Sequence, residues 1–445
     1  MHRVMPPWLR WGLLVCIISA SAMLPSARAS RSSASQVKLT WEVTNDTFWP
    51  PIAKTVIAAY TKLHPNVHIE LQLVDGPTYT QKVFIQASAG TLPDILLTAD
   101  AFTVPFAAHH ILLDMQPLLN ASPDYNISDV YSNFLNLGRL PGQSGLYMIP
   151  FSADAIVTFY NKDMFKAAGL AYPTANWTYA QFLDDAKKLT KTNASGRVTQ
   201  WGMSFFPTAS TGWALWVPWL SGFGGSLLSA DTKHTGFSNP GSISGMQAIQ
   251  DLFVKYKVAP GPTVQFPGDP FLSGNAAMGF SVHGAVAGWS QAIGKKFAWD
   301  VQVMPSFPNG KHVNGMGTAG FAVSENSKQR LAAWDVVKFV GSVAGQTALS
   351  KLGVTMPIRK SMLNNPVWRV PGLNNDAFVQ AIKYGITPPQ LSPLDSATNC
   401  GTVYAGVFNT TKDDMWGKIV RGRSVAAAAK AADQTINRCI DSLGN

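Results

Sequence analysis

The first part of the chain alternates between short apolar runs and segments with helical spacing. Residues 37–43 (VKLTWEV), 67–74 (VHIELQLV) and 95–97 predict strands, the last of which is too short for a helix and is expected to be buried. Residues 52–63 and 79–89 repeat apolar positions at helical spacing and predict helices. Strand, helix, strand, helix, strand predicts a parallel sheet with right-handed crossovers, and therefore an α/β fold.

The middle of the chain contains two less regular stretches. Residues 145–165 (GLYMIPFSADAIVTFYNKDMF) hold two apolar strands separated by Pro150 and Asp154. Residues 201–225 are dense in Trp and Gly and lack a clean period. This second stretch is predicted to be either a buried helix or one wall of a ligand site.

Helices dominate the predictions for the rest of the chain. Thr178 and Gln181 have capping-box spacing and start one helix. Residues 244–257 and 331–349 predict two amphipathic helices, and the C-terminal quarter is predicted to be largely helical up to Leu443.

The N-terminus predicts export. Arg3 and Arg10 precede or flank an apolar run over residues 11–20, and Ala27 and Ala29 form an A-x-A cleavage signature. This pattern is typical of a secretory signal peptide covering residues 1–29. Cleavage would leave 445 − 29 = 416 residues, and none of the later stretches has the roughly 18 consecutive apolar residues of a membrane span.

Composition narrows the class of protein. The mature length is enough for two large lobes. The net charge of +10 is spread along the chain without a basic stripe, so a nucleic-acid partner is not predicted. Fourteen Trp and 23 Phe in a chain with only 13% charged residues provide flat aromatic surface on which sugar rings can stack, although most of these side chains are expected in the core.

Two cysteines remain after the predicted cleavage. Cys400 and Cys439 could pair as a disulfide in an oxidising compartment. Two helices could equally hold them apart, and the sequence leaves both alternatives open.

Motifs for catalysis, metals and cofactors are weak. Residues 315–320 (GMGTAG) match G-x-G-x-x-G, but the strand-like FAVS follows them instead of a helix, so the glycines are expected to permit close backbone approach and not to bind a nucleotide. Pro65 separates His64 from His68, and no carboxylate completes a zinc set. No metal, cofactor or catalytic residue is predicted, although hydrolysis by two carboxylates from distant segments stays open.

One carboxylate is suggested as a ligand contact by its position at the end of a strand. Asp100 follows directly where the strand 95–97 and its small residues stop. In open α/β sheets, ligands bind beyond the carboxyl ends of the strands. Asp100 is therefore either a contact for a small molecule or a solvated turn residue.

Six motifs occur in the order seen in one protein family. They are ASAGTLPDI (87–95), HHILLDM (109–115), the stretch 145–165, FLSGNAAMGF (271–280), GMGTAGFAV (315–323) and GVTMPIRK (353–360). Together they resemble the extracellular solute-binding proteins of bacterial ABC importers, specifically the sugar-binding, maltose-binding-protein-like group. The resemblance covers essentially the whole mature chain.

The resemblance implies a two-lobed periplasmic-binding-protein fold of type II, in which each lobe is a sheet flanked by helices. The expected lobes are 30–150 plus 304–356 and 151–303 plus 357–445, with hinges near 149–151 and 303–305. It also implies a monomer outside the cytoplasm that is not an enzyme. Such a protein would capture a carbohydrate, an oligosaccharide above all, in the interlobe cleft and deliver it to a membrane permease.

The family's ligand contacts carry over to polar and aromatic positions of this chain. Asp154 stands the same distance before YNKD as the family's ligand carboxylate. Asn45 and Asp46 end the first strand, and Trp213 falls near the family's stacking aromatic, with core packing as its alternative. The full expected set is Asn45, Asp46, Trp49, Asp100, Asp154, Trp213, His283, Trp289, Gly317 and Arg359.

Two other functions remain as alternatives. A binding protein for glycerol phosphate or another phosphorylated polyol would need a cation or backbone N–H groups in the cleft, and Arg359 is the cation that is well placed. A secreted carbohydrate-active enzyme would have the same richness in aromatic residues.

Overall fold

The computed structural model describes residues 36–140, 142–204, 212–230, 233–261, 264, 266, 268–386, 400, 407 and 414–443. The predicted signal peptide, residues 1–29, lies outside this part of the chain. Within it, the helices are all too short or too polar to cross a membrane.

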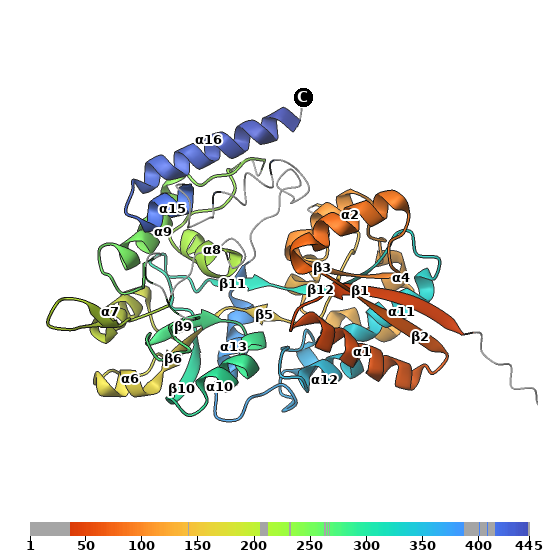
Figure 1. Cartoon of the computed structure of the whole chain (residues 1–445), viewed down its shortest axis with the longest axis horizontal. Helices are drawn as coiled ribbons and strands as arrows, with labels where there is room; N and C mark the ends of the chain where they lie inside the picture. The colour runs from red at the N-terminus through yellow and green to blue at the C-terminus, as the bar shows by residue number, and fades with distance from the viewer. Residues whose placement is uncertain are drawn as a thin grey trace, which may run out of the picture. The chain divides into compact units, whose positions relative to one another are not determined.

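A five-stranded sheet is built from the first part of the chain and one later strand (Figure 1). The predicted parallel arrangement of the first three strands is confirmed, and the fourth neighbour runs antiparallel to the third. The spatial order is β2 (Val67–Val74), β1 (Val37–Thr44), β3 (Ile95–Ala99), β12 (Ala319–Val323) and β4 (Ile149–Pro150).

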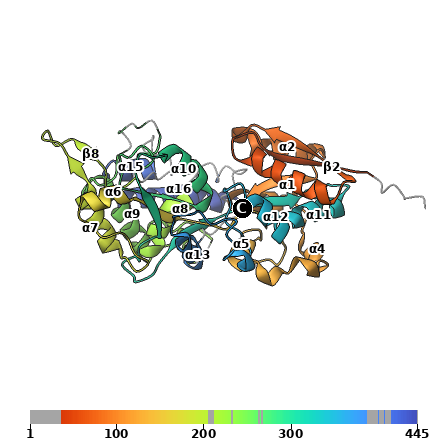
Figure 2. The same cartoon turned by 90° about the horizontal axis from the view of Figure 1, so that it is seen from below.

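Helices flank this sheet. Helix α2 (Tyr79–Ala89) has the predicted bounds and ends at Gly90, whose φ of 68° lies in the left-handed region that glycine tolerates. Helices α1 (Trp49–Leu63), α11 (Arg330–Val340) and α12 (Val343–Ser350) contact one another beside the sheet (Figure 2). The remaining helices of this region are α3 (Asp100–Ala108), α4 (Gln116–Asn120) and α5 (Ser132–Asn136), with short 3-10 turns η1 (Gly76–Thr78), η2 (Pro123–Tyr125), η3 (Ile127–Asp129) and η6 (Lys360–Met362).

The Pro-Asp pair before β3 joins three segments of the chain. The Asp94 carboxylate accepts hydrogen bonds from the N–H and the hydroxyl of Thr40 at 2.9 and 3.1 Å, and from the hydroxyl of Ser327 at 2.6 Å. Thr40 lies on β1 and Ser327 precedes α11. Asp94 therefore links β3 to β1 and to the segment before α11. These hydrogen bonds explain why a carboxylate stands at the start of a buried strand.

A second sheet contains three antiparallel strands, in the order β10 (Trp299–Val303), β6 (Val157–Asn161) and β9 (Met278–Ser281). The predicted capping box of Thr178 and Gln181 is present at the start of α7 (Tyr179–Leu189). The other helices here are α6 (Lys162–Ala167), α8 (Gly212–Gly222), α9 (Pro240–Phe253), α10 (Val286–Ile293), α13 (Asn375–Lys383), α15 (Met415–Val420) and α16 (Val425–Leu443), and β7 (Lys191–Thr192) pairs with β8 (Val198–Gln200).

Two helical predictions were wrong in detail. The helix expected over 244–257 begins and ends four residues earlier, as α9. The single helix expected over 331–349 is two helices, α11 and α12, with a break at Gly341 and Ser342. A Cβ on Gly341 would lie 2.1 Å from the Tyr125 hydroxyl, and the Ser342 side chain caps α12 by accepting the Gly345 N–H. The Trp-rich stretch includes helix α8, which is one of its two predicted forms.

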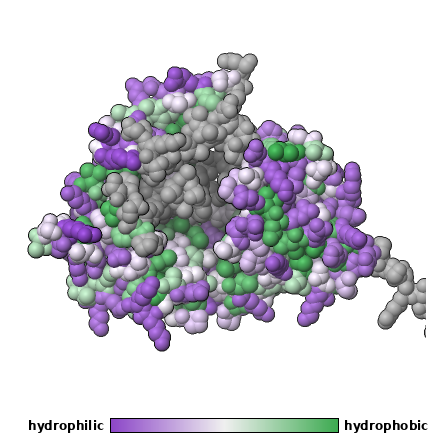
Figure 3. All heavy atoms as spheres, viewed as in Figure 1, coloured by the Kyte–Doolittle hydropathy of each residue, from purple (hydrophilic) through white to green (hydrophobic). Residues whose placement is uncertain are grey.

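The aromatic residues are mostly in the core of the described chain, as expected. Seven tryptophans are buried: Trp41, Trp177, Trp216, Trp219, Trp334, Trp368 and Trp416. On the face shown in Figure 3, hydrophilic side chains are widespread and apolar ones form smaller patches among them.

Of the two alternatives for the cysteines, the structure has the bonded one. Cys400 and Cys439 form a disulfide, with their Cα atoms 5.5 Å apart. Cys439 lies on α16, whose Asp433 also accepts hydrogen bonds from the N–H groups of Phe237 and Ser238 at 3.0 and 2.7 Å.

Candidate ligand-binding site

Two predicted site residues meet where the chain passes between the two sheets. Strand β5 (Asp154–Ala155) pairs antiparallel with β11 (Asn314–Gly317) (Figure 1). In this pairing, Gly317 lies opposite Asp154. Strand β11 also pairs with β13 (Gly385–Ile386). The hydroxyl of Thr318, directly after β11, donates to the Ser152 carbonyl at 2.7 Å.

The glycines of GMGTAG permit this close approach of strands, as predicted. A Cβ on Gly320 would lie only 2.1 Å from the Ile149 carbonyl oxygen. The motif spans the end of β11, Thr318 and the start of β12, and therefore lacks the helix that a dinucleotide site requires.

We call the pairing of β5 with β11, together with Ser152 and Thr318, the junction. Asp154 is its carboxylate. Its side chain is partly buried, and its Oδ1 atom has no hydrogen-bond partner within the described ranges. Burial raises the pKa of Asp154 to about 6, against the opposing effects of the Ser152 hydroxyl and the Gly284 N–H. Gly284 belongs to the 3-10 turn η5 (His283–Ala285), and a Cβ built on it would lie 3.9 Å from Asp154 Oδ1.

His283 is packed inside the protein. Its Nε2 atom lies 3.0 Å from the Trp368 carbonyl oxygen, and its ring meets the rings of Trp368 and Phe378 edge-on at centroid distances of 5.5 and 5.0 Å. Burial lowers the pKa of His283 to about 4, although the Trp368 carbonyl favours the charged ring. These contacts fix η5 beside Asp154 and are those of a core side chain.

Opposite pH dependences are expected from these two groups. The raised pKa of Asp154 favours the folded state at low pH, so its contribution to stability falls as the pH rises from about 4 to 6. The lowered pKa of His283 acts in the reverse sense, since its contribution is lost as the pH falls from about 6.5 to 4. Each contribution is on the order of 3 kcal/mol at most, and the two largely cancel.

Asp154→Asn should therefore reveal the His283 contribution. Relative to the natural chain, the variant should gain about 2–3 kcal/mol of unfolding free energy as the pH rises from 4 to 6.5. Urea unfolding of both proteins across this range measures the difference, and parallel stability curves would contradict it.

Trp289 and Trp49 both make aromatic contacts. Trp289 packs against Phe159 and Phe271 at centroid distances of 4.5 and 5.5 Å, so core packing describes its present contacts. The ring of Trp49 lies edge-on to the ring of Phe151, with a centroid distance of 5.1 Å, and Phe151 lies three residues before Asp154. Trp49 therefore contacts the segment that leads into the junction, whereas Trp289 belongs to the aromatic core beside β6.

Asn45 and Asp46 are exposed after β1, as expected for residues at the end of a strand. The Asp46 carboxylate accepts hydrogen bonds from the N–H groups of Phe48 and Trp49 at 2.7 and 2.9 Å and from the Thr44 hydroxyl at 2.6 Å. These bonds satisfy free N–H groups at the start of α1. The carboxylate of Asp46 thus has a structural role in the observed conformation.

Asp100 and Trp213 lie near the starts of helices α3 and α8. Their side chains are outside the part of the chain that the structure describes. Their expected ligand contacts therefore stay predictions.

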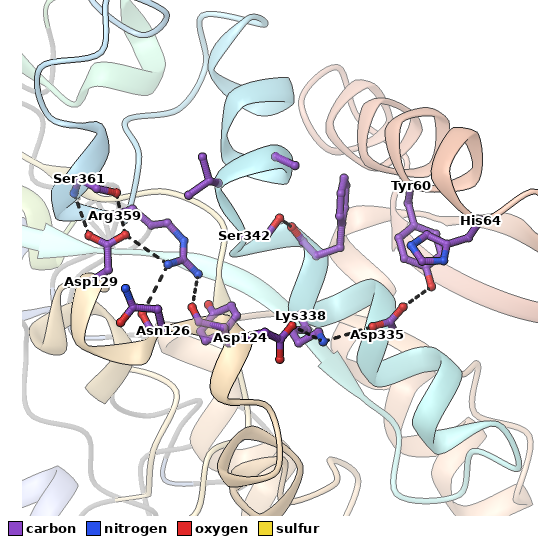
Figure 4. A pocket seen from close by; sticks show the side chains of 14 residues that line it. Tyr60, His64, Asp124, Asn126, Asp129, Asp335, Lys338, Ser342, Arg359 and Ser361 are labelled. Atoms are coloured by element: carbon purple, nitrogen blue, oxygen red, sulfur yellow. Dashed lines mark hydrogen bonds and ion pairs between the residues drawn. The ribbon is translucent and has the colours of Figure 1, made fainter.

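Arg359 is buried, and its side chain forms hydrogen bonds within the protein. It donates to the carbonyl oxygens of Gly341 and Tyr125 at 2.6 and 2.7 Å and to the Asp129 carboxylate at 3.2 Å. Burial raises the pKa of Asp129, but hydrogen bonds from Ser361 and Arg359 outweigh it and leave the pKa lowered. Figure 4 shows the bonds that Asp129 accepts from Arg359 and Ser361, at one side of a pocket of about 740 Å³ that Tyr60, Asp335 and Lys338 also line.

Sequence reasoning missed the residues that hold the junction together. Gln346, buried in α12, donates to the carbonyl oxygens of Phe151 and Val340 at 3.0 Å each and accepts the Ile358 N–H at 2.9 Å. Ser152 and Thr318 flank Asp154 and Gly317 in space. The signal for Ser152 was its polar position between two apolar runs, two residues before Asp154.

The described side chains do not form a metal site. Across the described segments, His, Cys, Asp and Glu side chains do not gather in groups of three or more that could hold an ion.

Comparison with known proteins defines the class. The chain matches the family model for bacterial extracellular solute-binding proteins over residues 41–347, and it therefore belongs to this family. The family is one of binding proteins and not of enzymes.

A characterised relative is also a solute-binding protein. The chain is 22% identical over 363 residues to a galactooligosaccharide-binding protein of Bacillus subtilis, covering 78% of this chain and 79% of the relative.

Solved structures show the same fold. An ABC substrate-binding protein from Listeria monocytogenes in complex with cycloalternan has a TM-score of 0.74 and 22% identity, covering 92% of this chain and 100% of the other. UgpB from Mycobacterium tuberculosis in complex with glycerophosphocholine has a TM-score of 0.75 and 15% identity, covering 92% and 99%. The predicted two-lobed periplasmic-binding-protein fold is confirmed.

Proposed function

We propose that this protein is the extracytoplasmic binding component of an ABC importer and that it captures an uncharged oligosaccharide for a membrane permease. The observation that carries the proposal is Asp154, a partly buried carboxyl with an Oδ1 atom that lacks a partner among the described residues, at the junction of the two sheets. A carboxylate accepts hydrogen bonds from adjacent sugar hydroxyls, and hydrogen bonds to charged groups are among the strong ones.

Aromatic faces would complete the site. Trp49 is attached to the junction through Phe151, and Trp213 starts a helix rich in Trp. Both are proposed to cover the apolar C–H faces of the sugar rings. The galactooligosaccharide-binding relative and the cycloalternan complex are consistent with an oligosaccharide.

A phosphorylated polyol is the second candidate. The fold similarity to UgpB, whose structure contains glycerophosphocholine, is the reason to test a phosphorylated ligand as well. Arg359, the cation that such a ligand would need, is buried and directs its donors to Gly341, Tyr125 and Asp129. Asp154 would also repel an anion, so the balance favours an uncharged ligand.

A panel measured by thermal shift and product analysis tests the function. It should contain neutral mono- and oligosaccharides, glycerol 3-phosphate and glycerophosphocholine. Stabilisation by a neutral sugar without turnover supports the proposal, because a ligand that binds the folded state raises its stability. Product formation would instead indicate an enzyme, and stabilisation by phosphorylated compounds alone would favour the second candidate.

We further propose that the protein is a monomer whose two lobes close on the ligand by bending at two hinge segments. The first is 149–151. For the second, hydrogen bonds favour 317–319 over the expected 303–305, because the Trp177 indole N–H donates to the Val303 carbonyl at 2.8 Å and the Ser306 N–H donates to the Trp177 carbonyl at 3.0 Å. Residues 303–306 are thus still attached to the region of the second sheet.

Closure predicts a smaller radius of gyration when the protein is saturated with the most stabilising sugar of the panel. Small-angle X-ray scattering with and without that sugar measures the change, and the forward scattering gives the mass of the particle. An unchanged radius of gyration at saturation would contradict closure.

A further inference from the structure

Two buried hydroxyls near Asp154 lack an ordinary hydrogen bond within the described part of the chain. The Oγ atom of Ser152 and the Oγ1 atom of Thr355 are inaccessible to solvent and, like Oδ1 of Asp154, have no partner in hydrogen-bond geometry. The Ser152 hydroxyl is nevertheless close enough to the Asp154 carboxylate to oppose the rise of its pKa. Buried polar groups are nearly always satisfied, so several such atoms on converging segments need an explanation.

The residues before and after Thr355 both contact the neighbours of Asp154. The carbonyl of the next residue, Met356, accepts the Ala153 N–H at 2.9 Å. The carbonyl oxygen of the preceding residue, Val354, lies 2.9 Å from the position that a Cβ on Gly284 would take. Ala153 and Gly284 are the backbone neighbours of the Asp154 carboxyl, so three segments far apart in the sequence converge here.

The chemistry of these groups is that of hydroxyl recognition. Each hydroxyl can donate one hydrogen bond and accept others, and the Asp154 carboxylate accepts them. Burial and not a neighbouring charge is the main influence on Asp154. Among the described residues, no cation acts on this carboxylate, so an anionic ligand would be repelled by it, whereas an uncharged polyol can satisfy all three groups.

We propose that Ser152 and Thr355 are specificity-determining residues that, with Asp154, bind adjacent hydroxyl groups of an uncharged sugar. This inference rests on the proposed function. A ligand that lacks the matching hydroxyls would leave buried groups unpaired, and sites built on hydrogen bonds reject such analogues strongly.

Ser152→Ala and Thr355→Val remove the hydroxyls with little change of shape, and Ser324→Ala is the matched control. Ser324 is also buried, and its Oγ is likewise unpartnered in the described chain. It follows the far end of β12 from Thr318, so the five residues of that strand separate it from the junction by about 16 Å.

The expected signature is a loss of affinity without a loss of stability. Without ligand, all three variants should unfold at the same temperature as the natural chain or slightly higher, because an unsatisfied buried group has been removed. For the trisaccharides galactotriose, maltotriose and cellotriose, whichever binds best, calorimetric titration should show about tenfold weaker binding for Ser152→Ala and Thr355→Val. Ser324→Ala should bind with unchanged affinity.

Other results would overturn the inference. Unchanged affinity in Ser152→Ala and Thr355→Val would show that these hydroxyls do not contact the sugar. A marked fall in unfolding temperature in both would show that they are structural. If none of the three trisaccharides binds the natural chain, the proposed function itself fails for them, and the inference falls with it.

Discussion

Arg359→Ala should lower the free energy of unfolding by roughly 3–5 kcal/mol, the scale expected when one partner of a buried ion pair is removed. Arg359 is buried, and its guanidinium holds Gly341, Tyr125 and Asp129 together. Removing it leaves two carbonyl oxygens and the Asp129 carboxylate without this donor. Urea unfolding measures the loss.

Arg369→Ala is the matched control. The Arg369 side chain is partly exposed and pairs with the exposed Asp376 at 2.9 Å. Exposed ion pairs contribute about 0–1 kcal/mol, so this variant should stay close to the natural stability.

The comparison also tests the phosphorylated-ligand alternative. If Arg359 is structural, the folded fraction of Arg359→Ala should keep its sugar affinity. A variant with natural stability that no longer binds glycerol 3-phosphate or glycerophosphocholine, which the natural chain did bind, would show that Arg359 is a ligand contact.

Asp154→Asn should weaken binding of the best sugar of the panel by about 10- to 100-fold at pH 7, corresponding to roughly 1.5–3 kcal/mol for a hydrogen bond to a charged group. Folding at pH 7 should be intact or improved by up to about 2–3 kcal/mol, because a charge that costs free energy to bury has been removed. A loss of binding combined with a gain in stability is difficult to explain by misfolding.

Calorimetric titration and urea unfolding at pH 7 measure both effects. Asp184→Asn provides the control, since Asp184 lies exposed on α7 and pairs with Lys188 at 2.6 Å. This control should bind as the natural chain does. Full-strength binding by Asp154→Asn would place the ligand elsewhere.

Local patterns in the sequence were enough for much of the fold. The bounds of α2 and the capping box of Thr178 and Gln181 were predicted because helix ends depend on neighbouring residues. The parallel orientation of β1, β2 and β3 followed from the alternation of strands and helices. Motif resemblance also gave Asp154 as a candidate ligand contact, since its spacing to YNKD matches that of the family within one segment, and this contact stays a prediction.

The sequence alone did not distinguish ligand contacts from side chains with structural partners. Arg359 and His283 were expected to contact a ligand, and this stays a prediction. Within the chain, Arg359 binds Asp129 and backbone carbonyls, and His283 binds the Trp368 carbonyl and packs against aromatic rings. A charged or polar residue looks the same in the sequence whether its partner is a ligand or a distant part of the same chain.

Local periodicity within the sequence determined most of the helices and the first three strands, and the family resemblance gave Asp154 as the predicted ligand carboxylate. The tertiary structure alone decided that β12 joins the first sheet antiparallel and that the helix predicted over 331–349 is interrupted at Ser342, next to Gly341 and the Tyr125 hydroxyl. It also decided that the segment containing Thr355 lies beside the segment containing Ser152 and Asp154. The physical reason is that these features depend on contacts between segments far apart in the chain, where close approach and hydrogen-bond satisfaction, and not local spacing, select the arrangement.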